Sequence, residues 1–182
     1  MTEKESTRIS KFLSLVLRHK PETIGIALDE HGWTDVDTLL IKMADAAQPI
    51  SRETLQYIVD TNAKKRFAFN SEGDKIRASQ GHSVEVDLDY EPQAPQAILY
   101  HGTGERSVTA ILDAGLQKMG RQHVHLSADI ETAIKVGSRH GKPVVFEILA
   151  QQMHDRGYAF YLSANGVWLT DNVPKEYLKI RP

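Results

Sequence analysis

One stretch of the sequence, residues 81–96 (GHSVEVDLDYEPQAPQ), most constrains how this chain can fold. It is acidic, contains no Lys or Arg, places Pro92 and Pro95 close together and has no helical periodicity. Apolar residues repeat at helical spacing before it, whereas short strand-like runs alternate with helices after it. A length of 182 residues lies between one ordinary domain and two small ones. We therefore predict two lobes, residues 1–83 and 98–182, joined by an acidic linker over residues 84–97.

The first lobe has the pattern of three helices. The first helix takes Ser6 or Thr7 as its N-cap and ends before Pro21. The second begins at Thr34 or Asp35, and the third begins at Ser51. The apolar residues whose spacing defines these helices are Ile9, Phe12, Leu13, Val16, Leu17, Val36, Leu39, Leu40, Met43, Leu55, Ile58 and Val59.

After the third helix the period changes to two residues, which is typical of strands. Residues 66–69 and 75–78 predict a β-hairpin with a turn over residues 70–74. Three helices followed by a hairpin form a winged-helix-like lobe, a module that commonly contacts nucleic acid. A small α+β packing domain has the same pattern, so the pattern alone does not decide between them. The Ser83–Tyr90 segment alternates apolar and acidic residues and could add a further strand.

The second lobe has the pattern of a mixed α+β domain. Asn-Gly between two apolar runs, in the Ala164–Gly166 segment, predicts a hairpin and argues against an all-parallel sheet. We predict strands at residues 98–101, 123–127, 143–149, 158–163 and 167–170, and helices at residues 107–116 and 129–139.

The composition excludes several classes of function. The chain has no cysteine, which rules out disulfides, thiolate nucleophiles and thiolate zinc sites and suits a reducing cytoplasm. No apolar run approaches the ~20 residues that a membrane span needs, and the polar start is unlike a signal peptide. The formal net charge of −2 means that a local basic cluster must hold any polyanion. We expect a cytoplasmic monomer with no membrane partner.

Two basic clusters lie in the first lobe. Residues 18–20 (RHK) end the first helix, where cations favour the helix dipole, and Arg18 should lie at the edge of the apolar stripe. Residues 64–66 (KKR) enter the hairpin, where strand alternation puts Lys64 and Arg66 on one face. Each cluster is either solvated surface charge or a phosphate clamp, because a guanidinium fork matches two phosphate oxygens.

Two polar clusters lie in the second lobe. Along a strand over residues 121–127 (RQHVHLS), Arg121, His123 and His125 would project to one face. A His-x-His pair suggests a metal, but no carboxylate stands at ligand spacing in the segment, so we predict a face for a negatively charged substrate and no metal. The glycines of residues 100–104 (YHGTG) either form a simple turn or allow the backbone to approach a ligand.

These clusters and their neighbours form an ordered set of eight short motifs. In chain order the motifs are LRHKP at 17–21, GW at 32–33, KRF at 65–67, IRA with QGHS at 76–83, LYHGT at 99–103, HVHLS at 123–127, GKPVV at 141–145 and NGVWLT at 165–170. The set closely resembles the NAD-dependent RNA 2′-phosphotransferases, the KptA-type relatives of the enzyme that finishes tRNA splicing in fungi. The resemblance runs from Ser10 to Leu178, which is nearly the whole chain.

The resemblance implies both a fold and a reaction. The fold is α+β, with an N-terminal winged-helix RNA-binding lobe followed by an ADP-ribosyltransferase-like mixed α/β lobe that binds NAD. An internal 2′-phosphate of a tRNA-like RNA attacks C1″ of NAD⁺, which is consumed as a co-substrate, and expels nicotinamide. O2″ of the resulting ADP-ribosylated RNA phosphate then attacks the phosphorus and releases 2′-hydroxyl RNA and ADP-ribose 1″,2″-cyclic phosphate. No metal is expected.

The resemblance also implies roles for individual residues. The phosphate and its transition state are expected to be held by Arg18, His19, Arg66 and Arg121. The residues expected to bind NAD are His101, Gly102, Thr103, His125 and Ser127. The residues expected to contact the RNA are Lys64, Lys65, Arg77 and His82. The NGVWLT segment lacks the glutamate that the wider ADP-ribosyltransferase superfamily often carries there, which argues against protein ADP-ribosylation.

Two other functions stay open at this stage. One is an ADP-ribosyltransferase that modifies nucleic-acid phosphates or ends and stops after the first step. The other is a winged-helix nucleic-acid-binding regulator that only senses NAD. The first 80 residues hold 12 Lys and Arg against 12 Asp and Glu, which counts against such a regulator because DNA binding depends on phosphate neutralisation.

Overall fold

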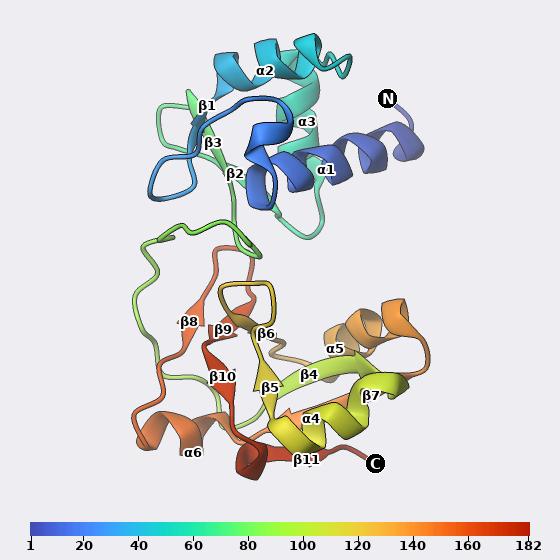
Figure 1. Ribbon diagram of the computed structural model, residues 1–182, viewed down its shortest axis with the longest axis vertical. Coiled ribbons are helices and arrows are strands. Elements are labelled where there is room, and N and C mark those ends of the chain that lie inside the picture. The colour runs from blue at the N-terminus through green and yellow to red at the C-terminus, as the bar shows by residue number, and fades with distance from the viewer. The chain divides into compact units, whose positions relative to one another are not determined.

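The computed structural model describes every residue from Met1 to Pro182 (Figure 1). The chain forms two compact units, Met1–Asp89 (unit 1) and Tyr90–Pro182 (unit 2). Residues 84–97 are divided between the two units, and Ser83–Tyr90 contains no strand. Both units combine helices with small antiparallel sheets, which confirms the predicted α+β class.

The first helix, α1, covers Glu3–Arg18 and begins earlier than predicted. Its N-cap is Thr2, whose hydroxyl accepts a hydrogen bond from the Glu5 amide at 3.2 Å. The Glu5 carboxylate in turn accepts from the Thr2 amide at 2.7 Å, which completes a capping box. The prediction of Ser6 or Thr7 as the cap was wrong, because this reciprocal pair, and not the first apolar residue, sets the start of the helix.

The other two helices of unit 1 begin where the sequence predicts. Asp35 caps α2 (Val36–Asp45), where its carboxylate accepts a backbone hydrogen bond at 2.7 Å. Ser51 caps α3 (Arg52–Thr61) in the same way at 3.1 Å. A short 3₁₀ helix, η1 (Pro21–Thr23), follows α1.

A three-stranded antiparallel sheet completes unit 1, in the order β1–β3–β2. The predicted hairpin is formed by β2 (Phe67–Phe69) and β3 (Lys75–Ala78). The first strand, β1 (Thr34–Asp35), pairs with the other edge of β3 and was not predicted. Two residues are too few to show a period, and their partners lie far along the chain.

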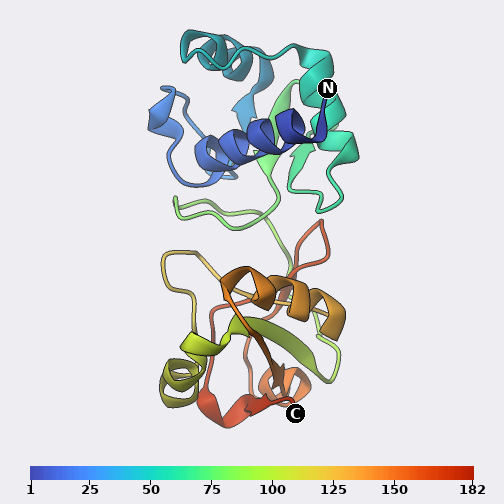
Figure 2. The same ribbon diagram turned by 90° about the vertical axis from the view of Figure 1, so that its right-hand side faces the viewer.

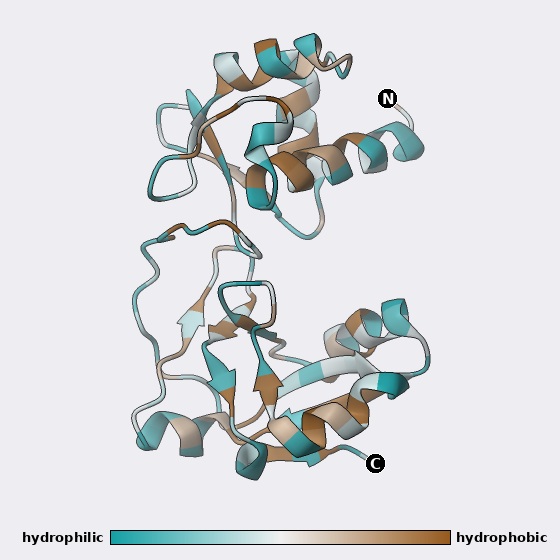
Figure 3. Ribbon diagram, viewed as in Figure 1, coloured by the Kyte–Doolittle hydropathy of each residue, from teal (hydrophilic) through white to brown (hydrophobic).

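The helices and the sheet of unit 1 share one apolar core. Figure 3 shows hydrophobic residues along α1 and α3, on the predicted stripes. Leu13, Leu17, Leu39, Leu55 and Ile76 are fully buried, at 0% exposure. Burying side chains of this size contributes about 1.5–3 kcal/mol each. The core therefore holds the end of α1 against the sheet.

Unit 2 is built on three small antiparallel sheets, in the orders β11–β7–β4, β6–β9–β8 and β10–β5. The strands are β4 (Leu99–Gly104), β5 (Leu116–Gln117), β6 (Val124–Leu126), β7 (Pro143–Ile148), β8 (Tyr161–Leu162), β9 (Trp168–Thr170), β10 (Asn172–Val173) and β11 (Leu178–Ile180). A bridge between Tyr100 and Ser127 links β4 to the residue after β6. Every pairing is antiparallel, as the predicted 164–166 hairpin suggested.

The helices of unit 2 are short. They are α4 (Val108–Ala114), α5 (Ile130–Gly137) and α6 (Ala150–Asp155), with 3₁₀ turns η2 (Glu105–Ser107), η3 (Ser138–His140) and η4 (Lys175–Tyr177). Figure 2 shows α5 lying along β4, with which it makes close contacts. α6 and the strands β5, β10 and β11 were not predicted from the sequence. No helix of the chain has the length and apolarity to cross a membrane.

Gly102 lets α5 approach β4 closely. A Cβ atom at Gly102 would lie 1.6 Å from the carbonyl oxygen of Ala133, which belongs to the backbone of α5. A backbone atom cannot move aside as the end of a flexible side chain can. The glycine is therefore a packing requirement of unit 2.

We predict that Gly102→Ala lowers the free energy of unfolding by about 3 kcal/mol, because helix and strand must separate to admit the methyl group. Gly120→Ala is the matched control, since nothing lies within 4 Å of a Cβ there. Urea unfolding followed by circular dichroism measures both variants. Equal stability of the two variants would contradict the packing role of Gly102.

Candidate functional site

The end of α1 places Arg18 and His19 beside the segment that follows β3. The Arg18 carbonyl accepts hydrogen bonds from the backbone amides of Ser83 at 2.9 Å and Val84 at 3.3 Å. The Ser83 hydroxyl lies 2.9 Å from Nδ1 of His19. Arg18 is half-buried and His19 is exposed. Two residues that are distant in sequence from Ser83 are thus fixed by the same short segment.

The same segment fixes Arg66, which immediately precedes β2. The Ser79 amide donates to the Arg66 carbonyl at 2.8 Å, and the Ser79 hydroxyl donates to the Lys65 carbonyl at 2.8 Å. Lys64 lies before the first residue of β2, so the predicted strand alternation of Lys64 and Arg66 was wrong. The Lys65 ammonium donates to the Asp60 carbonyl at 2.9 Å, near the end of α3. Both lysines are exposed.

His82 is buried, with 1% exposure. Neither ring nitrogen has a hydrogen-bond partner, and a Cβ at Gly32 would lie 3.3 Å from Nε2. Burial, together with the nearby charges of Arg18 and His19, lowers the pKa of His82 to about 4. The ring is therefore neutral at physiological pH and packs beneath charged neighbours.

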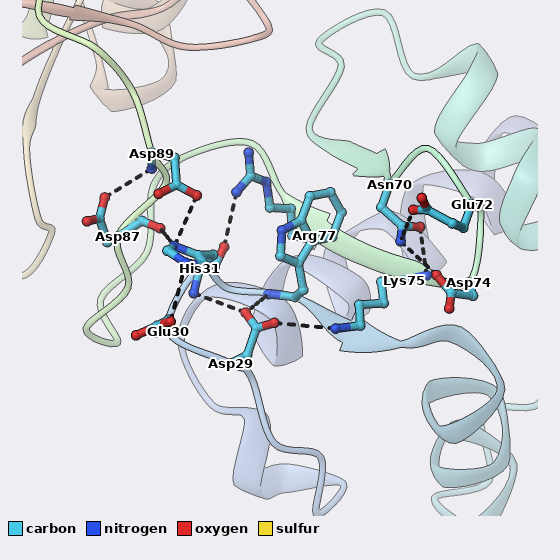
Figure 4. Close-up of polar contacts among 11 residues, drawn as sticks. Asp29, Glu30, His31, Asn70, Glu72, Asp74, Lys75, Arg77, Asp87 and Asp89 are labelled. Atoms are coloured by element: carbon cyan, nitrogen blue, oxygen red, sulfur yellow. Dashed lines mark hydrogen bonds and ion pairs between the residues drawn. The ribbon is translucent and has the colours of Figure 1, made fainter.

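Arg77 lies in a different polar network of unit 1 (Figure 4). Its guanidinium lies 4.4 Å from the centre of the Trp33 ring and donates to the His31 carbonyl at 3.2 Å. Nδ1 of His31 lies 2.8 Å from the Asp87 carbonyl and 3.0 Å from the Asp89 carboxylate. The hydrogen bond to Asp87 raises the pKa of His31, and the charge of Asp89 adds to it. Acidic groups thus surround His31, whose carbonyl accepts the hydrogen bond from Arg77.

In unit 2, Arg121, His125 and His101 form a chain of hydrogen bonds. Nη1 of Arg121 lies 3.3 Å from Nδ1 of His125, and Nδ1 of His101 lies 3.1 Å from the His125 carbonyl. A guanidinium only donates hydrogen bonds and a carbonyl only accepts them, so these two contacts determine the tautomers of His125 and His101. Neutral His125 carries its proton on Nε2, whereas neutral His101 carries it on Nδ1.

Burial lowers the pKa of His101, and the charge of Arg121 acts in the same direction. The neutral ring is therefore favoured. Because its Nδ1 donates to the His125 carbonyl, its Nε2 is a hydrogen-bond acceptor. Such a nitrogen can accept from a hydroxyl group of a ligand.

Gly102 directs its backbone polar groups to the edge of β4 that faces away from β7. This strand ends its sheet and pairs with β7 on one side only. Tyr100 exchanges hydrogen bonds with Ser127 on the other side, at 2.9 and 2.7 Å. Because the direction alternates along a strand, Gly102 points its N–H and C=O to that side, whereas Thr103 points them at β7. A ligand with one donor and one acceptor fits this edge.

His123 does not join the predicted polar face. β6 covers only Val124–Leu126, so Arg121 and His123 lie in the preceding loop. The His123 ring packs against the Tyr161 ring at 5.6 Å between centroids, and burial lowers its pKa. Arg121 reaches His125 through the loop and not by strand alternation. No group of three or more His, Asp or Glu side chains is arranged to hold a metal ion.

Sequence comparison places the chain among known proteins. The family model described as RNA 2′-phosphotransferase, Tpt1 / KptA family, matches residues 4–172. The chain belongs to this family. A probable RNA 2′-phosphotransferase of Trichormus variabilis is 57% identical over 98% of this chain and 98% of its own. Relatives of the same name from Flavobacterium johnsoniae and Hahella chejuensis are 51% and 56% identical, over 100% and 94% of this chain and 100% and 92% of their own.

Sequence reasoning did not single out Ser83 as a site residue of this family member. Its side chain contacts His19 and its amide contacts Arg18, although both lie more than 60 residues earlier. The signal was available in the QGHS motif, where the polar residues Gln80, His82 and Ser83 follow the hairpin. The sequence did not indicate that the histidine of this motif is buried while the serine is exposed.

We predict that His82 makes the family member less stable in acid. A histidine with a lowered pKa in the folded state binds fewer protons than the unfolded chain, so stability falls as the pH drops from 6.5 towards 4. The loss from this one group is about 3 kcal/mol between pH 7 and pH 4. His82→Gln should lack that part of the loss.

Urea unfolding at both pH values measures this effect, with Trp33 fluorescence in a Trp168→Phe background reporting on unit 1. His140→Gln, at an exposed position of unit 2, is the control and should follow the parent protein. Parallel pH curves for His82→Gln and its parent would show that His82 does not carry the acid sensitivity.

Proposed function

We propose that this protein is an NAD⁺-dependent RNA 2′-phosphotransferase. It transfers an internal 2′-phosphate of RNA to NAD⁺ through an ADP-ribosylated RNA phosphate. The observation that carries the proposal is the hydrogen-bonded chain Arg121–His125–His101. It joins a cation suited to a phosphate to a neutral histidine suited to a ribose hydroxyl. Membership of the family and the names of the relatives agree with this activity.

Two features of unit 2 support NAD⁺ as the co-substrate. At Gly102, the edge of β4 that faces away from β7 presents one N–H and one C=O, which match the two polar groups of the nicotinamide carboxamide. Nε2 of His101 is an acceptor for a ribose hydroxyl. Thr103 and Ser127 lie beside this edge and complete the proposed NAD⁺ residues.

Two features of unit 1 support RNA as the other substrate. Its three helices precede the β2–β3 hairpin, in agreement with the pattern from which a winged-helix-like lobe was predicted. The exposed Lys64 and Lys65 lie before β2 and are suited to phosphates of the RNA backbone. Arg77 and His82 are further candidates. Because His82 is buried, it would act on RNA through its neighbours Arg18 and His19.

The proposed phosphate clamp consists of Arg18, His19 and Arg66 from unit 1 and Arg121 from unit 2. A phosphate monoester with a second pKa near 6 is mostly a dianion at neutral pH, so it needs no strong base to become a nucleophile. What it needs is orientation towards C1″ and neutralisation of its charge, which guanidinium groups supply. Arg121 forms no ion pair with a carboxylate in the structure, so its charge is available for a substrate.

The reaction proceeds in two substitutions. A phosphate oxygen bonds to C1″ while the C1″–N bond breaks, and the electron pair leaves with nicotinamide. The O2″ oxygen then bonds to phosphorus while the bond to the RNA 2′-oxygen breaks. The proton of the O2″ hydroxyl ends on the RNA 2′-oxygen. Arginines stabilise the charge that builds on the phosphoryl oxygens in this second step.

The absence of a glutamate near β9 suits this chemistry. Val167 precedes β9, and the first carboxylate after it is that of Asp171. A substrate whose phosphate is its own nucleophile does not need a carboxylate to activate it. The proposed substrate class, an RNA bearing an internal 2′-phosphate of the kind that tRNA splicing leaves, has such a phosphate.

A short RNA with one internal 2′-phosphate tests the proposal. We predict that the phosphate is removed only when NAD⁺ is present, with one nicotinamide released for each phosphate removed. Accumulation of a stable ADP-ribosylated RNA would instead favour an ADP-ribosyltransferase that stops after the first step. Retention of the phosphate with no release of nicotinamide would refute both.

We predict that Arg121→Ala lowers turnover about 1,000-fold, since removing one transition-state cation costs factors of this size. Arg121→Lys should recover only part of the rate, because an ammonium lacks the bidentate fork. Arg156→Ala, at an exposed position after α6, is the control and should keep the wild-type rate. A near-normal rate for Arg121→Ala would remove this residue from the clamp.

A further inference from the structure

We infer that Ser83 is a positioning residue that orients the His19 ring towards the phosphate of the substrate. The inference rests on the proposed function and adds a residue to it. Ser83 is exposed and lies directly after the buried His82, in a segment that forms no helix or strand. Its side-chain oxygen nevertheless lies 2.9 Å from Nδ1 of His19, across a separation of 64 residues.

The position of the Ser83 hydroxyl is fixed by the backbone. The amides of Ser83 and Val84 both donate to the carbonyl of Arg18, the residue before His19. The backbone that precedes Ser83 is fixed as well, because His82 is buried at 1% exposure and the Ser79 amide donates to the Arg66 carbonyl. Serine and histidine are therefore attached to the same anchor, and the hydroxyl needs little further ordering to meet the ring.

The chemistry of the proposed ligand decides the direction of this hydrogen bond. A phosphate dianion only accepts hydrogen bonds, so the His19 ring must present an N–H to it. If Ser83 donates its hydroxyl proton to Nδ1, the ring proton stays on Nε2, and Nε2–H can donate to the phosphate. The opposite direction would present a lone pair to the anion. Ser83 thus fixes the orientation of the ring, and its hydroxyl accommodates the tautomer that places an N–H on the phosphate.

Removing the hydroxyl leaves the anchor intact. Ser83→Ala keeps both backbone hydrogen bonds to Arg18 and buries no unsatisfied group, because residue 83 is exposed. The variant should therefore fold like the wild type. Its defect should lie in phosphate recognition alone.

The test measures binding and does not depend on turnover. Two RNAs of identical sequence, one with an internal 2′-phosphate and one with a 2′-hydroxyl, are titrated in the absence of NAD⁺. The ratio of their affinities isolates the contribution of the phosphate. We predict that Ser83→Ala lowers this ratio about tenfold, the size expected for one lost hydrogen bond at a charged ligand. Ser83→Thr keeps the hydroxyl and should restore the ratio, and Ser71→Ala, in the hairpin turn, should not change it.

A double-mutant cycle separates positioning from a general structural role. In a His19→Ala background, Ser83→Ala should have no further effect on the ratio, because the ring that it orients is gone. No loss in Ser83→Ala, or an equal loss with and without His19, would overturn the inference. A wild-type protein that binds both RNAs equally would instead refute the proposed function, so the two failures are distinguishable.

Discussion

The hydrogen bond from Arg121 to His125 joins the two parts of the chemistry in unit 2. On one side it holds a guanidinium that has no carboxylate partner, and on the other it leads through the His125 carbonyl to His101. An arginine paired with a carboxylate would already be neutralised, whereas one held by a neutral imidazole keeps its charge for a ligand. The pKa of His101, lowered by burial, keeps the end of this chain neutral. The charge of Arg121 and the acceptor nitrogen of His101 are thus linked through His125.

In unit 1, backbone hydrogen bonds hold cationic residues in place. Residues 79–84 donate to the carbonyls of Arg66 and Arg18, and so fix two cationic residues that lie far apart in sequence. The buried ring of His82 fills the space near Gly32. These amides bind main-chain oxygens, so they leave the charges of the Arg18 and Arg66 side chains unaltered. The segment therefore holds the backbone in place at both residues.

Local features of the fold were predictable from the sequence, and non-local ones were not. Asp35 and Ser51 cap their helices because a cap depends on residues three positions apart. β1 was missed because its pairing with β3 depends on distant residues. The same distinction holds at the candidate site. Arg18, Arg66 and Arg121 were selected from basic clusters and from the family resemblance, but the contact between Ser83 and His19 and the burial of His82 arise from tertiary packing.

The eight ordered motifs predicted the family, and membership is confirmed over residues 4–172. The central claim is that the phosphate moves from RNA to NAD⁺ and is not hydrolysed. The most direct measurement uses an RNA whose single internal 2′-phosphate carries ³²P, incubated with the protein and NAD⁺, and follows the label by chromatography. All of the released label should appear in ADP-ribose 1″,2″-cyclic phosphate. Label released as inorganic phosphate, at a rate independent of NAD⁺, would contradict the claim.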